Sequence, residues 1–166
     1  MRKPFILCVV GPRRHVGKTA VITQIIREMK KRGLSVGTVK HIGDRSAFDL
    51  SPRKDTSRHL EAGSTITHAV TSSEIITIRR DLPITLESAL SLFPKGLHYI
   101  LVEGFKQSQY PKIVVVNSFS EDLQVKGDVI ALVMGEKEIM RPGANTDPEK
   151  FDVQLLVKLI EDYFAS

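Results

Sequence analysis

The chain has 166 residues, a formal net charge of +5, and 42% hydrophobic and 26% charged residues. This length and composition predict a single globular domain spanning residues 1–166, and the positive balance favours anionic partners such as nucleotides. No apolar run is long enough to cross a membrane, and the apolar stretch near the N-terminus leads into a glycine loop rather than a signal-peptide cleavage site.

Two residue counts narrow the function and location further. The chain has no tryptophan, few aromatic residues and no long basic run, which disfavours a nucleic-acid-binding protein. Its single cysteine, Cys8, cannot form an internal disulfide and is expected to pack as a small hydrophobic residue. These features fit a cytoplasmic protein without a membrane partner.

The first elements in the chain predict a β-α-β unit. Residues 5–10 are apolar and typical of a buried strand. Apolar residues then recur at helical spacing from Val21 to Met29, and Gly33 follows where a helix-ending glycine belongs. Residues 34–40 predict a second strand, which the helical connection makes parallel to the first.

The middle of the chain predicts a mixture of short elements. A long polar loop at residues 41–53 precedes a short helix at 54–62. Two strands, at 65–71 and 74–79, are expected to form a hairpin that turns at Ser72-Ser73. Thr85 is placed to cap a further helix that carries Leu86, Ala89, Leu90 and Phe93.

The last third predicts three more strands and a C-terminal helix. The strands are expected at residues 98–102, 112–116 and 129–134. Asp147-Pro148-Glu149 predicts the start of the helix, with Phe151, Leu155, Leu156, Leu159, Ile160 and Phe164 on its apolar face. We therefore expect an α/β, three-layer fold of the P-loop NTPase type, in which a mostly parallel twisted sheet carries helices on both faces and some antiparallel edge strands.

The segment between the first strand and the first helix predicts a phosphate-binding loop. Gly17 lets the backbone approach phosphate oxygens, and the N–H groups from Val16 to Ala20 open a helix whose dipole favours anions. Lys18 supplies a positive charge for the terminal phosphates, and the Thr19 hydroxyl is an oxygen ligand suited to Mg²⁺.

The start of this loop departs from the common G-x-x-x-x-G-K-[ST] pattern. Five residues separate Gly11 from Gly17, so the loop is either one residue longer or begins without its glycine, with Pro12 at that position. Three cationic or titratable residues lie inside it: Arg13, Arg14 and His15. They are candidates for additional phosphate contacts, with solvated side chains as the alternative.

A second group of candidate residues follows two predicted strands. Glu103 ends the strand at 98–102 and is a candidate metal ligand, because carboxylates at such strand ends hold Mg²⁺ directly or through water. Lys40 and His41 end another strand, and Lys106 follows a few residues after Glu103. Since ligands bind at the carboxyl ends of parallel strands, these side chains are expected near Lys18, with salt-bridge or solvated roles as alternatives.

Several blocks of the sequence, in order, resemble the molybdopterin-guanine dinucleotide biosynthesis protein B family. The blocks are Val16-Gly17-Lys18-Thr19, Val36-Gly37-Thr38-Val39-Lys40-His41, Phe48-Asp49 with Lys54-Asp55-Thr56, Glu61-Ala62-Gly63-Ser64, and Ile100-Leu101-Val102-Glu103-Gly104-Phe105-Lys106.

The resemblance implies a P-loop GTP-binding protein that aids attachment of GMP to molybdopterin. It implies a homodimer that works beside a molybdopterin guanylyltransferase, possible contacts with molybdoenzymes, weak GTP hydrolysis, and GTP, Mg²⁺ and molybdopterin or its guanine dinucleotide as ligands. By position, Gly17, Lys18 and Thr19 would hold phosphates and Mg²⁺, Glu103 would lie on the metal side, and the same cleft would be lined by Lys40, His41 and Lys106.

The sequence departs from this family in the residues from Pro12 to His15 and in a segment around Phe48–Asp55 that is one residue short. Two alternative functions stay open: a small P-loop kinase or phosphotransferase, for which arginines of the 45–58 region would act in a lid, and a cofactor-delivery module without turnover.

Overall fold

The computed structural model describes residues 3–13, 15–43, 54–118, 124–135, 137–142 and 148–166. These residues fall into two compact units, one formed by Met1–His41 with Phe93–Ser166 and the other by Ile42–Leu92. The predictions for Arg14, for most of the 41–53 loop and for Asp147 lie outside the described residues.

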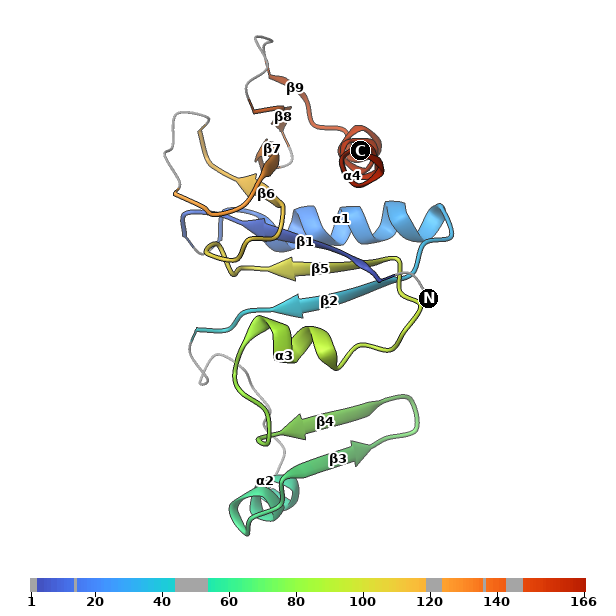
Figure 1. The fold of residues 1–166 in the computed structure, drawn as a ribbon, viewed down its shortest axis with the longest axis vertical. Coiled ribbons are helices and arrows are strands. Elements are labelled where there is room, and N and C mark those ends of the chain that lie inside the picture. The colour runs from blue at the N-terminus through green and yellow to red at the C-terminus, as the bar shows by residue number, and fades with distance from the viewer. Residues whose placement is uncertain (1–2, 14, 44–53, 119–123, 136, 143–147) are drawn as a thin grey trace. The chain divides into compact units, whose positions relative to one another are not determined.

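The first unit is built on a seven-stranded mixed sheet (Figure 1). Its order is β2-β5-β1-β6-β7-β8-β9, and the first five of these strands run parallel to their neighbours. The last two strands pair antiparallel at one edge, as expected. The strands are β1 (Phe5–Val10), β2 (Val36–Lys40), β5 (Tyr99–Glu103), β6 (Lys112–Val115), β7 (Val129–Met134), β8 (Glu138–Met140) and β9 (Glu149–Lys150).

Two helices, α1 (Lys18–Lys31) and α4 (Val153–Ala165), pack against each other and against one face of this sheet. Their apolar residues join alternate residues of the strands in the main hydrophobic core, because successive strand residues point to opposite faces. Fully buried Leu7, Ile25 and Ile160 belong to this core, and the Phe5 and Phe164 rings stack 4.5 Å apart. The α/β fold with a mostly parallel sheet is thus confirmed.

A lysine is buried on the edge of the core, at the start of β6. Lys112 is fully buried, and its Nζ donates hydrogen bonds to the Ser108 carbonyl at 2.7 Å and the Tyr110 carbonyl at 2.6 Å. The Ser108 hydroxyl also lies 3.4 Å from both Lys112 Nζ and the buried Cys8 Sγ. The ammonium thereby holds the segment that returns from β5 to β6. Cys8 is buried in β1, as predicted.

The second unit contains α2 (Lys54–Glu61), β3 (Ile66–Val70), β4 (Ile75–Arg79) and α3 (Leu86–Ser91). The two strands form the predicted hairpin, which the Thr71 N–H closes by donating to the Glu74 carbonyl. Thr85 caps α3 as predicted, because its hydroxyl accepts a hydrogen bond from the Ser88 N–H at 3.1 Å. In the described part of the chain, no helix has the length and apolar character needed to cross a membrane.

The predicted start of the C-terminal helix is wrong. Glu149 and Lys150 form β9 and pair with β8, and the helix begins at Val153. Asp152 caps it, with its carboxylate accepting a hydrogen bond from the Gln154 N–H at 2.8 Å. The local sequence at Glu149 favours a helix start, but strand pairing at the sheet edge places Glu149 and Lys150 in a strand instead.

Candidate phosphate-binding site

The loop between β1 and α1 begins at Gly11, directly after the last residue of β1. A Cβ added to Gly11 would lie 2.7 Å from the Val115 carbonyl oxygen and 2.7 Å from Val16 Cγ2. Only glycine fits at so close an approach. This geometry favours the longer loop, with five residues between its two glycines, over a loop that begins at Pro12.

Two residues with positive φ shape the end of the loop. His15 has a φ of 61°, and Gly17, which precedes the first helical residue, has a φ of 99°. A positive φ is uncommon for a residue other than glycine, although histidine is one of the residue types found there most often, and His15 is exposed. Such a backbone conformation is typical of functional loops, where it fixes backbone groups for a ligand.

The helix α1 begins with amide donors directed out of its N-terminus. The Val21 N–H donates to the Gly17 carbonyl at 3.0 Å, which is the first bond of the regular helical pattern. The N–H groups of Lys18, Thr19 and Ala20 therefore precede that pattern and point along the helix axis toward the loop. With the left-handed Gly17, they form an N-terminus that suits phosphate oxygens.

Lys18 folds back over the loop. Its Nζ donates a hydrogen bond to the Arg13 carbonyl at 2.7 Å, which places the ammonium across the strand–helix turn. Burial lowers the pKa of Lys18, the nearby Glu103 carboxylate opposes that change, and the Lys40 ammonium adds to it. The side chain is thus a partly desolvated cation beside a glycine loop.

Glu103 joins the loop to the neighbouring strands. The Thr19 hydroxyl donates a hydrogen bond to Glu103 Oε2 at 3.0 Å, and Lys40 Nζ lies 3.5 Å from the same oxygen. The sheet register explains this meeting, since Glu103 pairs with Val9 of β1 on one side and with Lys40 of β2 on the other.

Hydrogen bonds also fix the backbone around Glu103. The His41 N–H donates to the Glu103 carbonyl at 2.9 Å, and the Gly104 N–H donates to the Val9 carbonyl at 3.0 Å. Gly104 has a φ of 103°, and a Cβ there would lie 2.9 Å from His41 Cβ. The structure therefore brings Lys18, Thr19, Lys40, His41 and Glu103 to one edge of the sheet.

The other predicted site residues are placed less directly. Val16 is buried in the core, so its backbone rather than its side chain would serve a ligand. Arg13 is exposed and offers its carbonyl to Lys18, and Ala20 is exposed in the first turn of α1. Lys106 is exposed, and its carbonyl accepts a hydrogen bond from the Lys126 N–H.

Two residues outside the predicted site also shape this edge of the sheet. Phe105 has a φ of 56°, and its ring centroid lies 4.8 Å from that of His41. Gly135 follows β7, and its Cα would lie 3.7 Å from a Cβ on Gly17. The signal for Gly135 was its position, because it is a glycine at the carboxyl end of a parallel strand.

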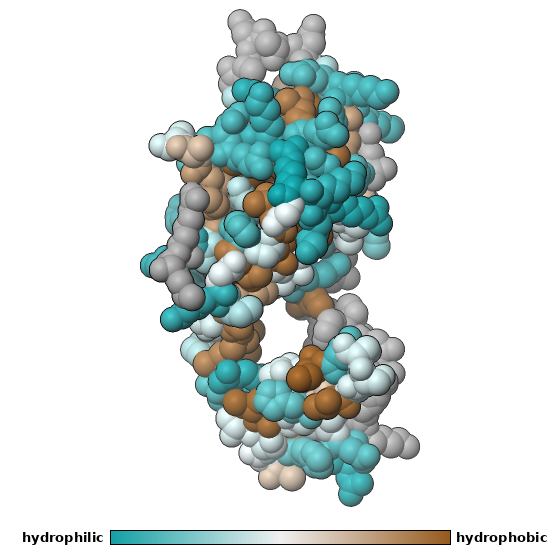
Figure 2. Space-filling view, turned by 90° about the vertical axis from the view of Figure 1, so that its right-hand side faces the viewer, coloured by the Kyte–Doolittle hydropathy of each residue, from teal (hydrophilic) through white to brown (hydrophobic). Residues whose placement is uncertain are grey.

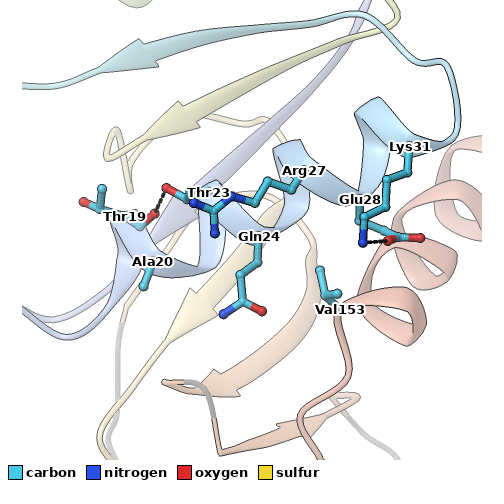
Figure 3. A pocket seen from close by; sticks show the side chains of 8 residues that line it. All are labelled: Thr19, Ala20, Thr23, Gln24, Arg27, Glu28, Lys31 and Val153. Carbon is cyan, nitrogen blue, oxygen red and sulfur yellow. Dashed lines mark hydrogen bonds and ion pairs between the residues drawn. The ribbon is translucent and has the colours of Figure 1, made fainter.

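An open groove of about 460 Å³ runs along α1 away from the loop (Figure 3). Among the described residues, it shares only Thr19 and Ala20 with the predicted site. The next residue along the groove is Thr23, whose hydroxyl donates a hydrogen bond to the Thr19 carbonyl. Farther along, Lys31 pairs with the buried Glu28. The groove therefore shares only the first turn of α1 with the residues suited to phosphate, and Gly17, Lys18 and Glu103 are not among its lining residues.

The donors at this edge fit a magnesium–nucleotide complex. A hydroxyl whose hydrogen is directed to a carboxylate keeps its lone pairs available for a hard cation, and Thr19 and Glu103 have this arrangement. In the described residues, no three His, Cys, Asp or Glu side chains gather into a metal site of their own. Phosphate and water would therefore complete the metal's shell, as Mg²⁺ commonly requires.

Comparison with known proteins identifies relatives of the chain. The model of a family described as molybdopterin guanine dinucleotide synthesis protein B (MobB) matches residues 6–135. The probable molybdopterin-guanine dinucleotide biosynthesis adapter protein of Bacillus subtilis (strain 168) is 32% identical over 143 residues, covering 83% of this chain and 81% of that protein.

A second relative and a solved structure agree with this match. The molybdopterin-guanine dinucleotide biosynthesis adapter protein of Haemophilus influenzae (strain ATCC 51907 / DSM 11121 / KW20 / Rd) is 33% identical over 101 residues, covering 60% of this chain and 56% of that protein. The crystal structure of Bacillus subtilis MobB has a TM-score of 0.69 and 25% identity, covering 95% of this chain and 97% of that one. With the strand–loop–helix geometry and the family match over most of its length, the chain belongs to the MobB family, named for molybdopterin guanine dinucleotide synthesis.

Proposed function

We propose that this protein binds GTP with Mg²⁺ and acts as an accessory protein in molybdenum cofactor maturation, where it assists attachment of GMP to molybdopterin. The observation that carries the nucleotide site is the shared contact of Thr19 and Lys40 with Glu103, beside the glycine loop closed by Lys18. A cation, a hydroxyl and a carboxylate gathered beside a glycine loop support a site for a triphosphate and its metal.

Each residue has a distinct role in this proposal. The N–H groups at the start of α1 and the Lys18 ammonium would bind phosphate oxygens, and Thr19 and Glu103 would hold Mg²⁺. The metal, when bound, neutralises charge on the phosphates. We propose slow hydrolysis, in keeping with a role in positioning a nucleotide for a partner enzyme.

The choice of guanine over adenine rests on family membership. Isothermal titration with GTP, GDP and ATP in the presence of Mg²⁺ tests the proposal, with Lys18→Met as the disabling variant. Lys158→Met is a matched control, because Lys158 is exposed on α4 and its removal changes the net charge equally. Absence of GTP binding, or equal binding by both variants, would rule out the proposed site, and rapid phosphate release would contradict slow hydrolysis.

The proposed partners are a molybdopterin guanylyltransferase, molybdoenzymes and a second copy of this chain, with molybdopterin or its guanine dinucleotide as a possible ligand and the cytoplasm as the place of action. The β3–β4 hairpin supports self-association, since Val70 and Ile75 are cross-strand partners that are 72% and 67% exposed. Figure 2 shows apolar surface on the unit that carries this hairpin. Isolated two-stranded sheets are marginally stable, so such a surface favours a partner.

Light scattering on purified protein tests the proposed dimer. A Val70→Lys, Ile75→Lys double variant is expected to be monomeric at concentrations where the parent protein is dimeric. Glu74→Lys, on the exposed turn beside them, is a control for the added charge. A monomeric parent protein would refute self-association, and a dimeric double variant would refute this hairpin as its surface.

A further inference from the structure

One carboxylate oxygen has two partners at the edge of the sheet. Glu103 Oε2 accepts the Thr19 hydroxyl hydrogen at 3.0 Å and lies 3.5 Å from the Lys40 ammonium. The Glu103 side chain is only 15% exposed, whereas that of Lys40 is 57% exposed. A largely buried carboxylate requires a positive partner, and here the most direct one is a side chain with access to solvent.

The contact follows from the architecture of the sheet. Lys40 and Glu103 are register partners at the carboxyl ends of two hydrogen-bonded parallel strands, and the His41 N–H bond to Glu103 fixes the backbone beyond them. The Lys40 stem therefore begins beside Glu103 in every state in which β2 and β5 are paired. Its mobile part is the long side chain, which can leave without disturbing the strands.

We propose that Lys40 is a built-in counter-ion of Glu103 that a divalent cation displaces, so that metal binding frees the Lys40 ammonium for the phosphates. This inference rests on the proposed function. Before the metal arrives, Lys40 neutralises Glu103. Once a cation is held by Thr19 and Glu103, the like charges of cation and ammonium repel each other.

The freed side chain would lie beside the glycine loop. Lys40 Nζ and the Thr19 hydroxyl contact the same Glu103 oxygen, and Lys18 directly precedes Thr19, so the Lys40 side chain ends close to the loop. When the metal occupies Glu103, the ammonium groups of Lys18 and Lys40 are both available to phosphate oxygens. Metal binding and phosphate binding then strengthen each other through Lys40. Its ammonium pairs with Glu103 when the metal is absent and binds phosphate when the metal is present.

Manganese is a suitable probe of the first half of this exchange, because free Mn²⁺ is measured directly by electron paramagnetic resonance. Without nucleotide, Lys40→Met is expected to bind Mn²⁺ about two- to five-fold more tightly, the effect of removing an exposed ion pair that competes with the metal. Lys40→Arg keeps the charge and should resemble the parent protein. Lys158→Met should also resemble it, which separates the local contact from the change in net charge.

Glu103→Gln identifies the site, since it should lose the Mn²⁺ ion that the other variants bind. The proposal is wrong if Lys40→Met binds Mn²⁺ no more tightly than Lys158→Met does. It is equally wrong if the parent protein and its Lys40→Met variant bind no Mn²⁺ that depends on Glu103.

A second measurement follows the lysine itself. Trace acylation with acetic anhydride, read by mass spectrometry, should modify Lys40 about two- to five-fold faster in the presence of Mn²⁺, because the ammonium no longer pairs with Glu103. The acylation rate of Lys158 in the same sample should not change. If Mn²⁺ left the acylation rate of Lys40 unaltered, the proposed displacement of Lys40 from Glu103 would be wrong. Neither measurement contains a nucleotide, so a failure to bind GTP would refute the proposed function separately and leave this test intact.

Discussion

Replacement of Gly11 by alanine tests whether the loop begins at this glycine. An added methyl group would lie 2.7 Å from the Val115 carbonyl oxygen and 2.7 Å from Val16 Cγ2, whereas ordinary contacts lie at 3.4–4 Å. Both neighbours are held, one by the β6 backbone and the other by the core. Overpacking of this kind costs about 1–3 kcal/mol.

The expected consequence is a lower stability and a displaced loop. For a chain of this size, each kcal/mol lowers Tm by about 2–4 °C, so Gly11→Ala should lower it by about 2–12 °C. Urea denaturation gives the free energy of unfolding directly. GDP affinity should fall as well, because the first turn of the loop must move to make room for the methyl group.

Gly43→Ala is the matched control. Among the residues that the structure describes, its added Cβ would meet no atom within 4 Å, so the substitution should change stability by no more than about 1 kcal/mol, in the stabilising direction if at all. If Gly11→Ala were as stable as Gly43→Ala and bound GDP as tightly as the parent protein, the close approach at Gly11 would have no importance, and the loop would have to begin elsewhere.

Three further substitutions test other parts of the structure. Because burial lowers the pKa of Lys18, GDP affinity should fall as the pH rises through that pKa, at a lower pH than for a free lysine. In titrations at several pH values, Lys18→Met should bind GDP about 10–100-fold more weakly at neutral pH, and its affinity should lose this pH dependence. Lys112→Met leaves two backbone carbonyls of the 108–110 segment without their donor and should lower the free energy of unfolding by about 1–3 kcal/mol, with faster hydrogen exchange in that segment; unchanged exchange would contradict the role of the lysine. Asp152→Ala removes the cap of α4 and should cost about 0.5–2 kcal/mol in urea denaturation, whereas Asp162→Ala, late in the same helix, should cost less; equal costs would refute the cap.

Local patterns were sufficient to predict the elements that form the site. The apolar run of β1, the periodic residues of α1 and the glycine between them each depend on neighbours in the sequence. Glu103 was identified because an apolar strand ends there in an acid. Its contact with Thr19 and Lys40 then follows from parallel pairing, which brings the carboxyl ends of three strands together.

Other features depend on contacts that no local pattern encodes. The strands β8 and β9 have only three and two residues, too few to show a strand pattern in the sequence, and pairing at the sheet edge defines them. Pairing by Glu149 and Lys150 also explains why the helix starts at Val153 instead of the predicted position. Sequence patterns cannot distinguish two caps of similar chemistry when tertiary pairing selects between them.

The burial of Lys112 and the backbone conformation of Phe105 also depend on tertiary contacts that no local sequence pattern encodes. A lysine within an apolar strand becomes acceptable only after residues 105–111 fold back and offer their carbonyls. Phe105 adopts a positive φ although it is not glycine, and its ring packs with that of His41, which directly follows β2. Both features arise from the segment that carries the chain away from Glu103.

The place where the chain leaves the sheet has a mechanical consequence. The unit Ile42–Leu92 is inserted immediately after His41, whose N–H is tied to the Glu103 backbone and whose predecessor contacts the Glu103 side chain. A protein that pulled on the inserted unit would apply tension at the residues that hold the candidate metal ligand. Force carried along the chain from residues 42–92 would therefore act first on the backbone beside Glu103.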